Sequence, residues 1–180
     1  MKKEDVQRIQ KKAHRFLKTV GIALTHDEAE AIEVADFGLG DQANMGFEIV
    51  TYVNNDCYCA KEIVLFPHQT CPEHRHPPVG PGIPGKQETF RCRWGDVYLY
   101  TVGEPAAKPK AVVPEAHRAH ISVWHEIVLR PGDQYTLPPD TLHWFQAGSK
   151  GAIVSEFSSP SRDELDVWTD PRIRREPTIE

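Results

Sequence analysis

The sequence is poor in three features, and each shortage excludes a class of protein. Its four cysteines form no Cys-x-x-Cys pair and are too few for a disulfide-stapled secreted fold. No apolar run approaches the length of a membrane span. Positive charge is also scarce, since 21 Lys and Arg are outnumbered by 26 Asp and Glu, for a formal net charge of −5. Nucleic acid and anionic membrane surfaces are therefore poor partners for this chain.

The length and composition predict one soluble domain. A chain of 180 residues can bury a core without staples, and its hydrophobic share of 39% and charged share of 26% are ordinary for a globular protein. No apolar segment follows the charged residues 1–8, so we expect no signal peptide. The scattered cysteines indicate reduced thiols, and the predicted location is the cytoplasm.

Helical periodicity is confined to the first part of the chain. Apolar residues recur at helical spacing over residues 4–19, which predicts an amphipathic helix. Thr25 and Glu28 form a capping-box pattern, which should open a second short helix that ends near Gly38. We therefore expect residues 1–44 to form a helical arm.

From residue 46 onward the pattern becomes that of short strands between Gly, Pro and Asp turns. The predicted strands are residues 47–53, 58–66, 88–93, 97–102, 122–129, 143–147 and 152–157. Many short strands of this kind favour a closed antiparallel barrel, which leaves no exposed edge and encloses a site. The chain is thus predicted to be mainly β, with the barrel over residues 45–160 and a charged tail over residues 161–180.

Four residues have the chemistry of metal ligands. His74 and His76 form a His-x-His pair, and both imidazoles can reach one ion because alternate residues of a strand point to one face. Glu88 and His143 follow later, each close to glycine or proline residues. Three neutral imidazoles and one carboxylate suit a divalent ion such as Mn, Fe, Zn, Co or Ni. An octahedral ion would keep positions open for substrate oxygens.

The spacing of these ligands resembles the two motifs of the cupin superfamily. In the first motif His-x-His is followed by a glutamate and, after a gap of six residues, by a glycine; Glu88 and Gly95 keep that gap. In the second motif a glycine, a proline and a histidine match Gly132, Pro138 and His143. The resemblance implies a cupin barrel with these four ligands.

The chain departs from the cupin motifs at three points. Eleven residues separate His76 from Glu88, where the motif has three or four. Asp140 stands in place of a glycine of the second motif, and Ala147 in place of its asparagine. The long gap is rich in Pro and Gly, so it is predicted to form a loop over the metal.

Three residues near the ligands have more than one interpretation. Trp144 can be a core residue or an aromatic wall for a sugar. His68 is close enough in sequence to support a ligand, and Glu73 should face away from the ion and support the site indirectly.

Longer segments resemble one family of cupins in particular. They are Leu65–Pro77, Gly85–Tyr100, Pro131–Ala147, Val154–Ser159 and Ser161–Glu164, with Ile32–Gly40 and Thr169–Ile173 near the two ends. These segments look like those of the cupin-type D-lyxose ketol-isomerases. The resemblance implies a Mn-dependent aldose–ketose isomerase that acts on D-lyxose and D-xylulose, and often on D-mannose and D-fructose.

The remaining candidate residues suit such a reaction, which moves a hydrogen between C1 and C2 of a sugar. Either a general base carries the proton or a hydride shifts without a base, and both mechanisms stay open. Glu156 is the candidate base if its side chain points into the barrel. Lys86 as a catalytic residue and Lys61 as a substrate-binding residue can donate to sugar oxygens, or both can be solvated. Arg162 is a further substrate-binding candidate, with a surface cation as its alternative.

Two other functions fit the same ligands. A cupin oxidase or dioxygenase would use iron or manganese together with oxygen, and a non-catalytic sugar-binding cupin would leave the sugar unchanged. The N-terminal helices lack the basic face of a DNA-binding regulator. By analogy with cupins we expect a homodimer whose small-molecule partner is a monosaccharide.

Overall fold

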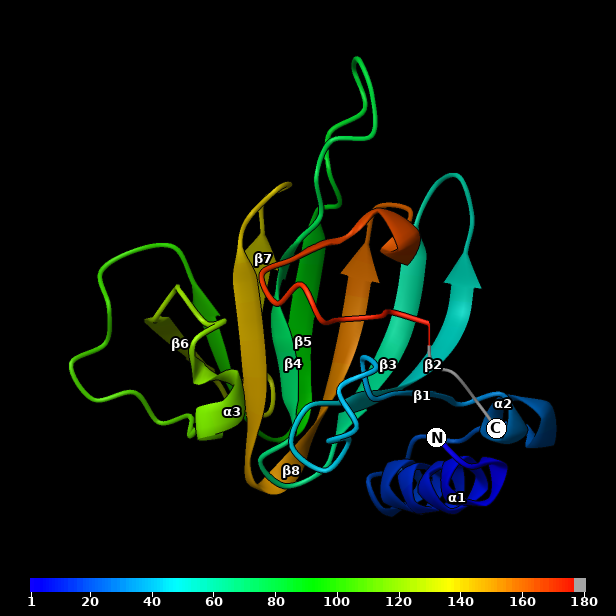
Figure 1. The fold of residues 1–180 in the computed structure, drawn as a ribbon. Helices are drawn as coiled ribbons and strands as arrows, with labels where there is room; N and C mark the ends of the chain where they lie inside the picture. Colours follow the sequence, from blue (N-terminus) through cyan, green and yellow to red (C-terminus); the bar gives the residue numbers. More distant parts are fainter. Residues whose placement is uncertain (177–180) are drawn as a thin grey trace.

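A nine-stranded antiparallel sheet forms the centre of the protein in the computed structural model, which describes residues 1–176 (Figure 1). The strands are β1 (Glu33–Ala35), β2 (Phe47–Asn54), β3 (Cys59–Leu65), β4 (Thr70–Arg75), β5 (Glu88–Thr101), β6 (His125–Leu129), β7 (Gln134–Leu137), β8 (His143–Ser158) and β9 (Val167–Trp168). The helices are α1 (Lys3–Thr19), α2 (His26–Glu30), α3 (Glu115–Arg118) and the 3-10 turn η1 (Asp163–Leu165). The predicted antiparallel, mainly β architecture is confirmed, and the sheet curls as a half-barrel.

Two long strands, β5 and β8, give the sheet its curl because each bends near its middle. The first part of β8 pairs with β4, and the part from Ala152 to Ser158 pairs with β3. β5 follows β8 along both parts, with register shifts on either side of Gly95. Gly95 and Gly151 have φ angles of +73° and +87°, a left-handed conformation that glycine adopts without steric penalty. The two bends return both ends of β8 to the same rim of the half-barrel (Figure 1).

These bends explain why the sequence predicted four short strands where the structure has two long ones. Residues 88–93 and 97–102 are parts of β5, and residues 143–147 and 152–157 are parts of β8. Glycine near each break is typical of a turn, but here the strands pass through the bend and keep pairing with each other.

The outer face of one layer is covered by α1, as the amphipathic pattern of residues 4–19 predicted. Its apolar stripe, which includes Ala13 and Leu17, packs against Val64 of β3 and Ile153 of β8. Full burial of an aliphatic side chain of this size contributes about 1.5–3 kcal/mol. The helix therefore supports the closed end of the half-barrel and leaves the opposite rim to the site.

The second helix is shorter than predicted. Thr25 and Glu28 make the expected capping box, but α2 ends at Glu30, and the prediction of an end near Gly38 is wrong. Residues Glu33–Ala35 instead form β1, which pairs with β2. The β-branched Val34 is the physical reason, since it packs into the apolar layer under α1 as part of the sheet.

The predicted charged tail contributes to the fold. Val167 and Trp168 form β9, which pairs with β4 at Arg75 and His74. Residues 177–180 of the predicted tail lie outside the described residues. Within residues 1–176, no helix is long and apolar enough to cross a membrane. The four cysteines are free thiols, as predicted.

Candidate metal centre

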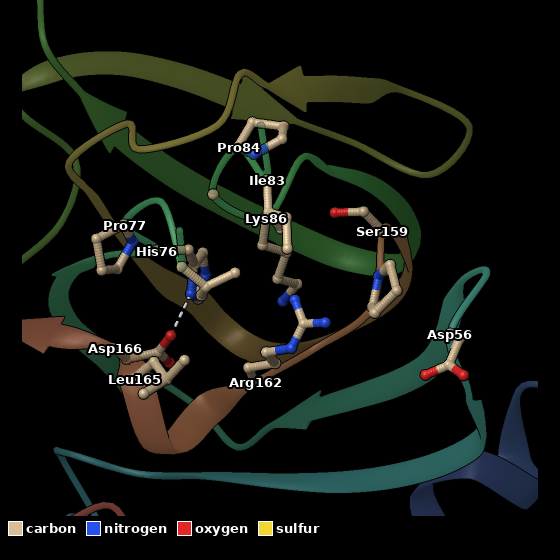
Figure 2. Close-up of a pocket in the computed structure, with 13 residues that line it drawn as sticks. Asp56, His76, Pro77, Ile83, Pro84, Lys86, Ser159, Arg162, Leu165 and Asp166 are labelled. Atoms are coloured by element: carbon tan, nitrogen blue, oxygen red, sulfur yellow. Dashed lines mark hydrogen bonds and ion pairs between the residues drawn. The ribbon is translucent and has the colours of Figure 1, made fainter. Parts of the chain in front are cut away.

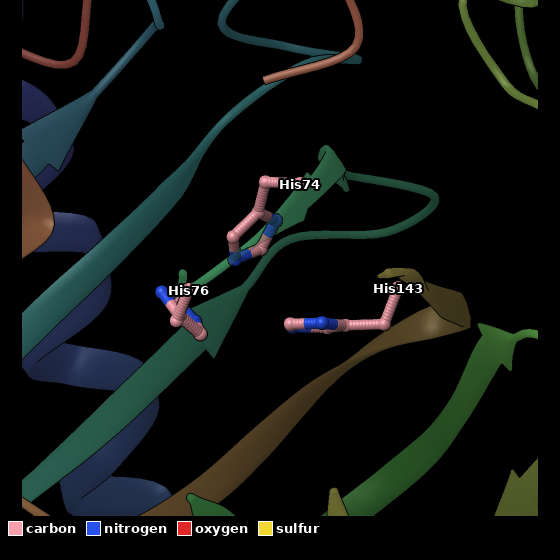
Figure 3. Close-up of side chains that lie close together, drawn as sticks. All are labelled: His74, His76 and His143. Carbon is pink, nitrogen blue, oxygen red and sulfur yellow. The ribbon is translucent and has the colours of Figure 1, made fainter. Parts of the chain in front are cut away.

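Three imidazoles meet at the rim of the half-barrel. His74 lies on β4, His76 follows directly after it, and His143 is the first residue of β8. His74 and His143 are cross-strand neighbours, and one nitrogen of each of the three rings lies within 4.8 Å of the others (Figure 3). All three side chains are buried. The structure thus brings together the three histidines that the sequence predicted as ligands.

The hydrogen bonds of these rings determine which nitrogen faces the site. Nδ1 of His74 lies 2.8 Å from the carbonyl of Pro72, and Nδ1 of His143 lies 2.9 Å from the carbonyl of Thr141. A carbonyl oxygen can only accept, so Nδ1 carries the proton in both rings and Nε2 keeps its lone pair. Ligating histidines in metal sites use the same arrangement, in which a second group fixes the tautomer and the ring orientation.

Glu88 brings a carboxylate to the same point. Its Oε1 lies 3.0 Å from Nε2 of His143 and 3.3 Å from Nε2 of His76. Among residues 1–176 these three buried atoms find no hydrogen-bond partner, although buried polar atoms are rarely left without one. A cation held between them would satisfy all three, so this donor set fits a divalent metal ion.

The electrostatic surroundings keep most of these groups in the protonation state of a ligand. Burial, together with the neighbouring imidazoles, holds the pKa of His74 well below its usual value. Burial alone would raise the pKa of Glu88, but the charges of Lys86 and His76 hold it well below its usual value. For His76, burial lowers the pKa, but Glu88 and the hydrogen bond to Asp166 raise it to about 9. A cation must therefore displace a proton from His76.

Lys86 connects Glu88 to Glu156 inside the half-barrel. Its Nζ lies 2.9 Å from Oε2 of Glu88 and 2.6 Å from Oε1 of Glu156, and all three side chains are buried. Burial lowers the pKa of Lys86, but the charges of Glu156, Glu88 and Asp163 raise it well above its usual value, so the lysine stays charged. Glu156 therefore points inward, and Lys86 is not a solvated surface residue.

Lys61 also points inward, one strand away from Glu156. The two residues are cross-strand neighbours on β3 and β8, and Lys61 is only 5% exposed. Its Nζ lies 3.0 Å from Oγ of Ser161 and 3.5 Å from Oδ2 of Asp163. Asp163 also pairs with Arg175, and these cations keep its pKa below its usual value although burial raises it. A second buried lysine thus faces the interior.

Two neighbouring cavities lie beside these residues and share part of their lining. The inner cavity, of about 30 Å³, is lined by His74, Glu88 and Glu156 among others. The outer pocket, of about 350 Å³, opens at the rim (Figure 2). Its lining includes Val79, Ile83, Pro84 and Gly85 of the predicted loop, Arg162, and three residues shared with the inner cavity, His76, Lys86 and Asp166. The outer pocket is within the size range of small-molecule sites.

Two sequence-based interpretations are corrected by the structure. Trp144 does not line either cavity: its ring stacks on Tyr100 at 4.1 Å on the outer face of the sheet, and its Nε1 donates to the carbonyl of Val123. Trp144 is therefore a core residue and not an aromatic wall for a sugar. His68 supports no ligand, because it lies in an exposed turn with a φ angle of 62°.

Within residues 1–176 the Glu73 carboxylate contacts none of the proposed ligands and forms no ion pair, so it anchors its strand instead. Glu73 is 1% exposed, and its carboxylate accepts hydrogen bonds from the backbone of Ser122 and Val123 and from the Thr169 hydroxyl. These contacts hold β4 against the segments on either side of it.

Three residues at the site were missed by the sequence reasoning, and all follow residue 160. Asp163 contacts Lys61, Asp166 contacts His76, and Trp168 stacks on His74 with ring centroids 4.6 Å apart. No local motif marks them, because each acts on a residue far away in the sequence. The one available signal was Trp168 itself, because an aromatic residue among acidic ones is unusual for a free tail.

Comparison with known proteins identifies close relatives. Residues 22–180 match the D-lyxose isomerase family. A D-lyxose/D-mannose isomerase of Thermosediminibacter oceani is 62% identical, covering 100% of this chain and 99% of the relative. A D-lyxose ketol-isomerase of Thermofilum sp. is 61% identical over 98% of both chains. One of Cohnella laeviribosi is 64% identical over 92% of this chain and 90% of the relative.

Solved structures give the same fold at low sequence identity. The L-ribose isomerase of Acinetobacter sp. DL28, in complex with L-ribose, has a TM-score of 0.82 at 14% identity and covers 100% of this chain and 98% of its own. The L-ribose isomerase of Cellulomonas parahominis has a TM-score of 0.83 at 13% identity, with the same coverage. These likenesses concern the fold alone.

Proposed function

This chain belongs to the D-lyxose isomerase family, and from that membership we propose that it interconverts D-lyxose and D-xylulose, and also D-mannose and D-fructose. The names of the relatives support the substrates: three include lyxose and one of these also includes mannose. One structural observation supports the proposal independently of the family: three ligand atoms without a hydrogen-bond partner among residues 1–176 converge beneath a pocket of about 350 Å³. The enzyme is a sugar isomerase whose site has room for a monosaccharide.

We assign one divalent ion, Mn(II) in preference to Co, Zn, Fe or Ni, to the ligands His74, His76, Glu88 and His143. Imidazole and carboxylate donors suit such an ion, and burial raises the pKa of the nearby Cys71 thiol, which disfavours the thiolate form that binds metals. When bound, the ion supplies Lewis-acid polarisation of the C1 and C2 oxygens of the sugar. The four proposed ligands lie on strands of the half-barrel or next to a strand end, so the sheet determines the distances between them.

Glu156 is the proposed base, and its carboxylate faces the cavity above Glu88. It takes the C2 proton of the aldose, the C–H electrons form a C1=C2 double bond, and the C1=O electrons move to O1, which takes a proton from the Lys86 ammonium to give an enediol. Glu156 then returns its proton to C1 while O2 gives its own proton back to Lys86 and becomes the ketone oxygen. The reverse order converts the ketose to the aldose.

The two lysines are proposed to handle the charge on the sugar oxygens. Lys86 has three protons, and two point toward Glu88 and Glu156, so one remains for the oxygen that becomes negative. Lys61 faces the same interior and is proposed to donate to a sugar hydroxyl. Arg162, on the wall of the outer pocket, is proposed to bind the end of the sugar that does not react.

The test removes and restores the metal. The protein is stripped with a chelator, reloaded singly with Mn, Co, Zn or Mg, and assayed anaerobically for ketose formation from D-lyxose, D-mannose and D-xylose. We expect ketose from lyxose and mannose only after reloading, with Mn most effective. His143→Ala should abolish metal binding, whereas the matched variant His26→Ala should not, because His26 is 82% exposed on α2.

The same assay separates the other candidate functions. Turnover that requires oxygen would indicate an oxidase, and saturable sugar binding without any change in the aldose to ketose ratio would indicate a binding protein. Activity that is indifferent to the chelator would contradict the assigned metal. The predicted homodimer and the predicted cytoplasmic location remain proposals, and light scattering of the purified protein tests the first.

A further inference from the structure

The three imidazoles of the site differ in the group that accepts a hydrogen bond from Nδ1. For His74 and His143 the acceptor is the backbone carbonyl two residues earlier in the same segment. For His76 it is the carboxylate of Asp166, whose Oδ1 lies 2.5 Å from Nδ1, although the two residues are 90 positions apart (Figure 2). Two ligands are therefore oriented by the backbone just before them, and the third depends on a distant segment.

That segment, residues 161–170, which we name the strap, lies along the strand that carries the ligands. Trp168 pairs with His74 in the sheet and stacks on its ring at an interplanar angle of 25°. The backbone N–H of Thr169 donates to the carbonyl of Glu73 at 3.1 Å. The strap crosses the open side of the half-barrel in Figure 1. Its contacts thus fall on the last residues of β4, next to two of the ligands.

The strap has one apolar anchor, Trp168, whose ring packs on Phe37 and against the core of the half-barrel. Its strand β9 has two residues, and Leu165 and Val167 are 44% and 42% exposed. The other anchors are polar, chiefly Asp163, which pairs with Lys61 and Arg175. Segments with few buried apolar contacts open at a lower free energy than the core. The docking of the strap therefore depends on polar contacts around the site, one of which is His76.

We propose that Asp166 is a positioning residue for His76 and that metal binding and strap docking are coupled. The inference rests on the metal site proposed above. A carboxylate that accepts the Nδ1 proton turns the Nε2 lone pair toward Glu88 and strengthens the imidazole as a donor. Any ion that binds better when the strap is docked must, by linkage, favour the docked strap by the same factor.

The first test measures the dissociation constant for Mn(II) and Co(II) by competition with a chelator. Asp166→Ala should weaken binding by about 10–100-fold, the usual effect of removing such a partner. Asp166→Asn keeps an acceptor and loses the charge, so it should fall between wild type and Asp166→Ala and change the visible absorption of bound Co(II). Glu164→Gln is the matched control, because Glu164 is exposed on the same segment and should bind metal like wild type.

The second test measures amide hydrogen exchange with and without Mn(II). In wild type, metal should slow exchange in the strap, including the Thr169 amide, and in Asp166→Ala this added protection should shrink. Equal dissociation constants for wild type and Asp166→Ala, or strap exchange that ignores metal, would overturn the inference while leaving the metal site in place. Wild type that binds no metal would overturn the site itself and the inference with it. Thermal melting in the presence of chelator identifies any variant that fails to fold. If Asp166→Ala fails, the dissociation constant and exchange of Asp166→Asn are compared with those of wild type instead.

Discussion

Nζ of Lys86 lies 2.6 Å from Oε1 of Glu156, and neither side chain is more than 6% exposed. The pair joins the proposed base to the proposed metal ligand Glu88, because the same ammonium also contacts Glu88. A buried charge without a partner is strongly unfavourable, so the three groups form one electrostatic unit. Each member is expected to act on both chemistry and stability.

The first prediction concerns the proposed base. Glu156→Gln should lower kcat by about 100-fold or more, because a general base contributes on the order of 10²–10⁴ to a proton-transfer step. Metal content should change little, since the amide keeps the shape of the side chain, but the melting temperature should fall, because the buried Lys86 ammonium loses one of its two charged partners. Steady-state kinetics and metal analysis check this, with Glu30→Gln as the exposed control. In D₂O, an enediol route should also place solvent deuterium on C1 of the ketose. A Glu156→Gln enzyme with near-normal kcat would contradict the assignment.

The second prediction concerns the ammonium between the two carboxylates. Lys86→Met should destabilise the metal-free protein by about 3–5 kcal/mol, because it leaves buried negative charge without compensation. The double variant Lys86→Met/Glu156→Gln removes one of those charges and should recover part of the loss. Denaturant unfolding of the four proteins of this cycle measures the coupling. Additive losses would indicate that Lys86 and Glu156 do not form an interacting pair.

The third prediction concerns the loop over the site. Gly85 passes so close to the end of β4 that a Cβ atom there would lie 1.8 Å from the carbonyl oxygen of His76. Gly85→Ala must therefore displace backbone next to a ligand, and we expect weaker metal binding and a loss of stability of about 1–3 kcal/mol or more. Chelator competition and melting check this. Pro81→Ala, at an exposed position of the same loop, is the control and should have neither effect.

The fourth prediction concerns a buried carboxyl group away from the site. Glu48 is fully buried between the sheet and neighbouring glutamines, and burial raises its pKa from 4.5 to about 8, although Gln69 and Gln42 donate to it. Between these two pH values the unfolded chain releases a proton that the folded protein retains. The folded state therefore loses stability as pH rises through this window, by at most about 1.4 kcal/mol per pH unit.

Glu48→Gln removes this dependence. Relative to wild type, the variant should gain stability steadily from about pH 5 to pH 8 and show no further gain above that range. Unfolding by urea at a series of pH values measures the difference between the two proteins, so that all other titrating groups cancel. A difference that is constant across the window would mean that Glu48 titrates alike in the folded and unfolded states.

The convergence of the proposed ligands was predictable from the sequence because their signals are local. His74 and His76 share a strand face by spacing alone, and Glu88 and His143 stand at fixed distances from glycine and proline. Strand alternation also makes the orientation of Trp144 predictable. It lies between His143 and Phe145, which point inward, so its own side chain must point outward. The same alternation applies to Glu156, but whether its side chain points inward or outward depends on how β8 passes the bend at Gly151, which the sequence does not show.

The contacts made after residue 160 were not predictable in this way. Asp166 meets His76 across 90 positions of sequence, and β9 exists only because β4 offers it an edge to pair with. The same holds for β1, a three-residue strand defined by its pairing with β2. Short strands have little propensity of their own, so tertiary pairing decides them, and a sequence pattern carries no trace of it.

The bent path of β8 has a consequence for how new sugar preferences can arise. One end of that strand supplies His143 and the other supplies Glu156, while the walls of the outer pocket come from the loop before β5 and the segment after β8. The groups proposed to react therefore lie on the rigid scaffold, and the surfaces proposed to contact the rest of the substrate lie on connecting segments, which tolerate change. Exchanging residues in those segments should retune which monosaccharide is accepted and leave the hydrogen transfer itself intact.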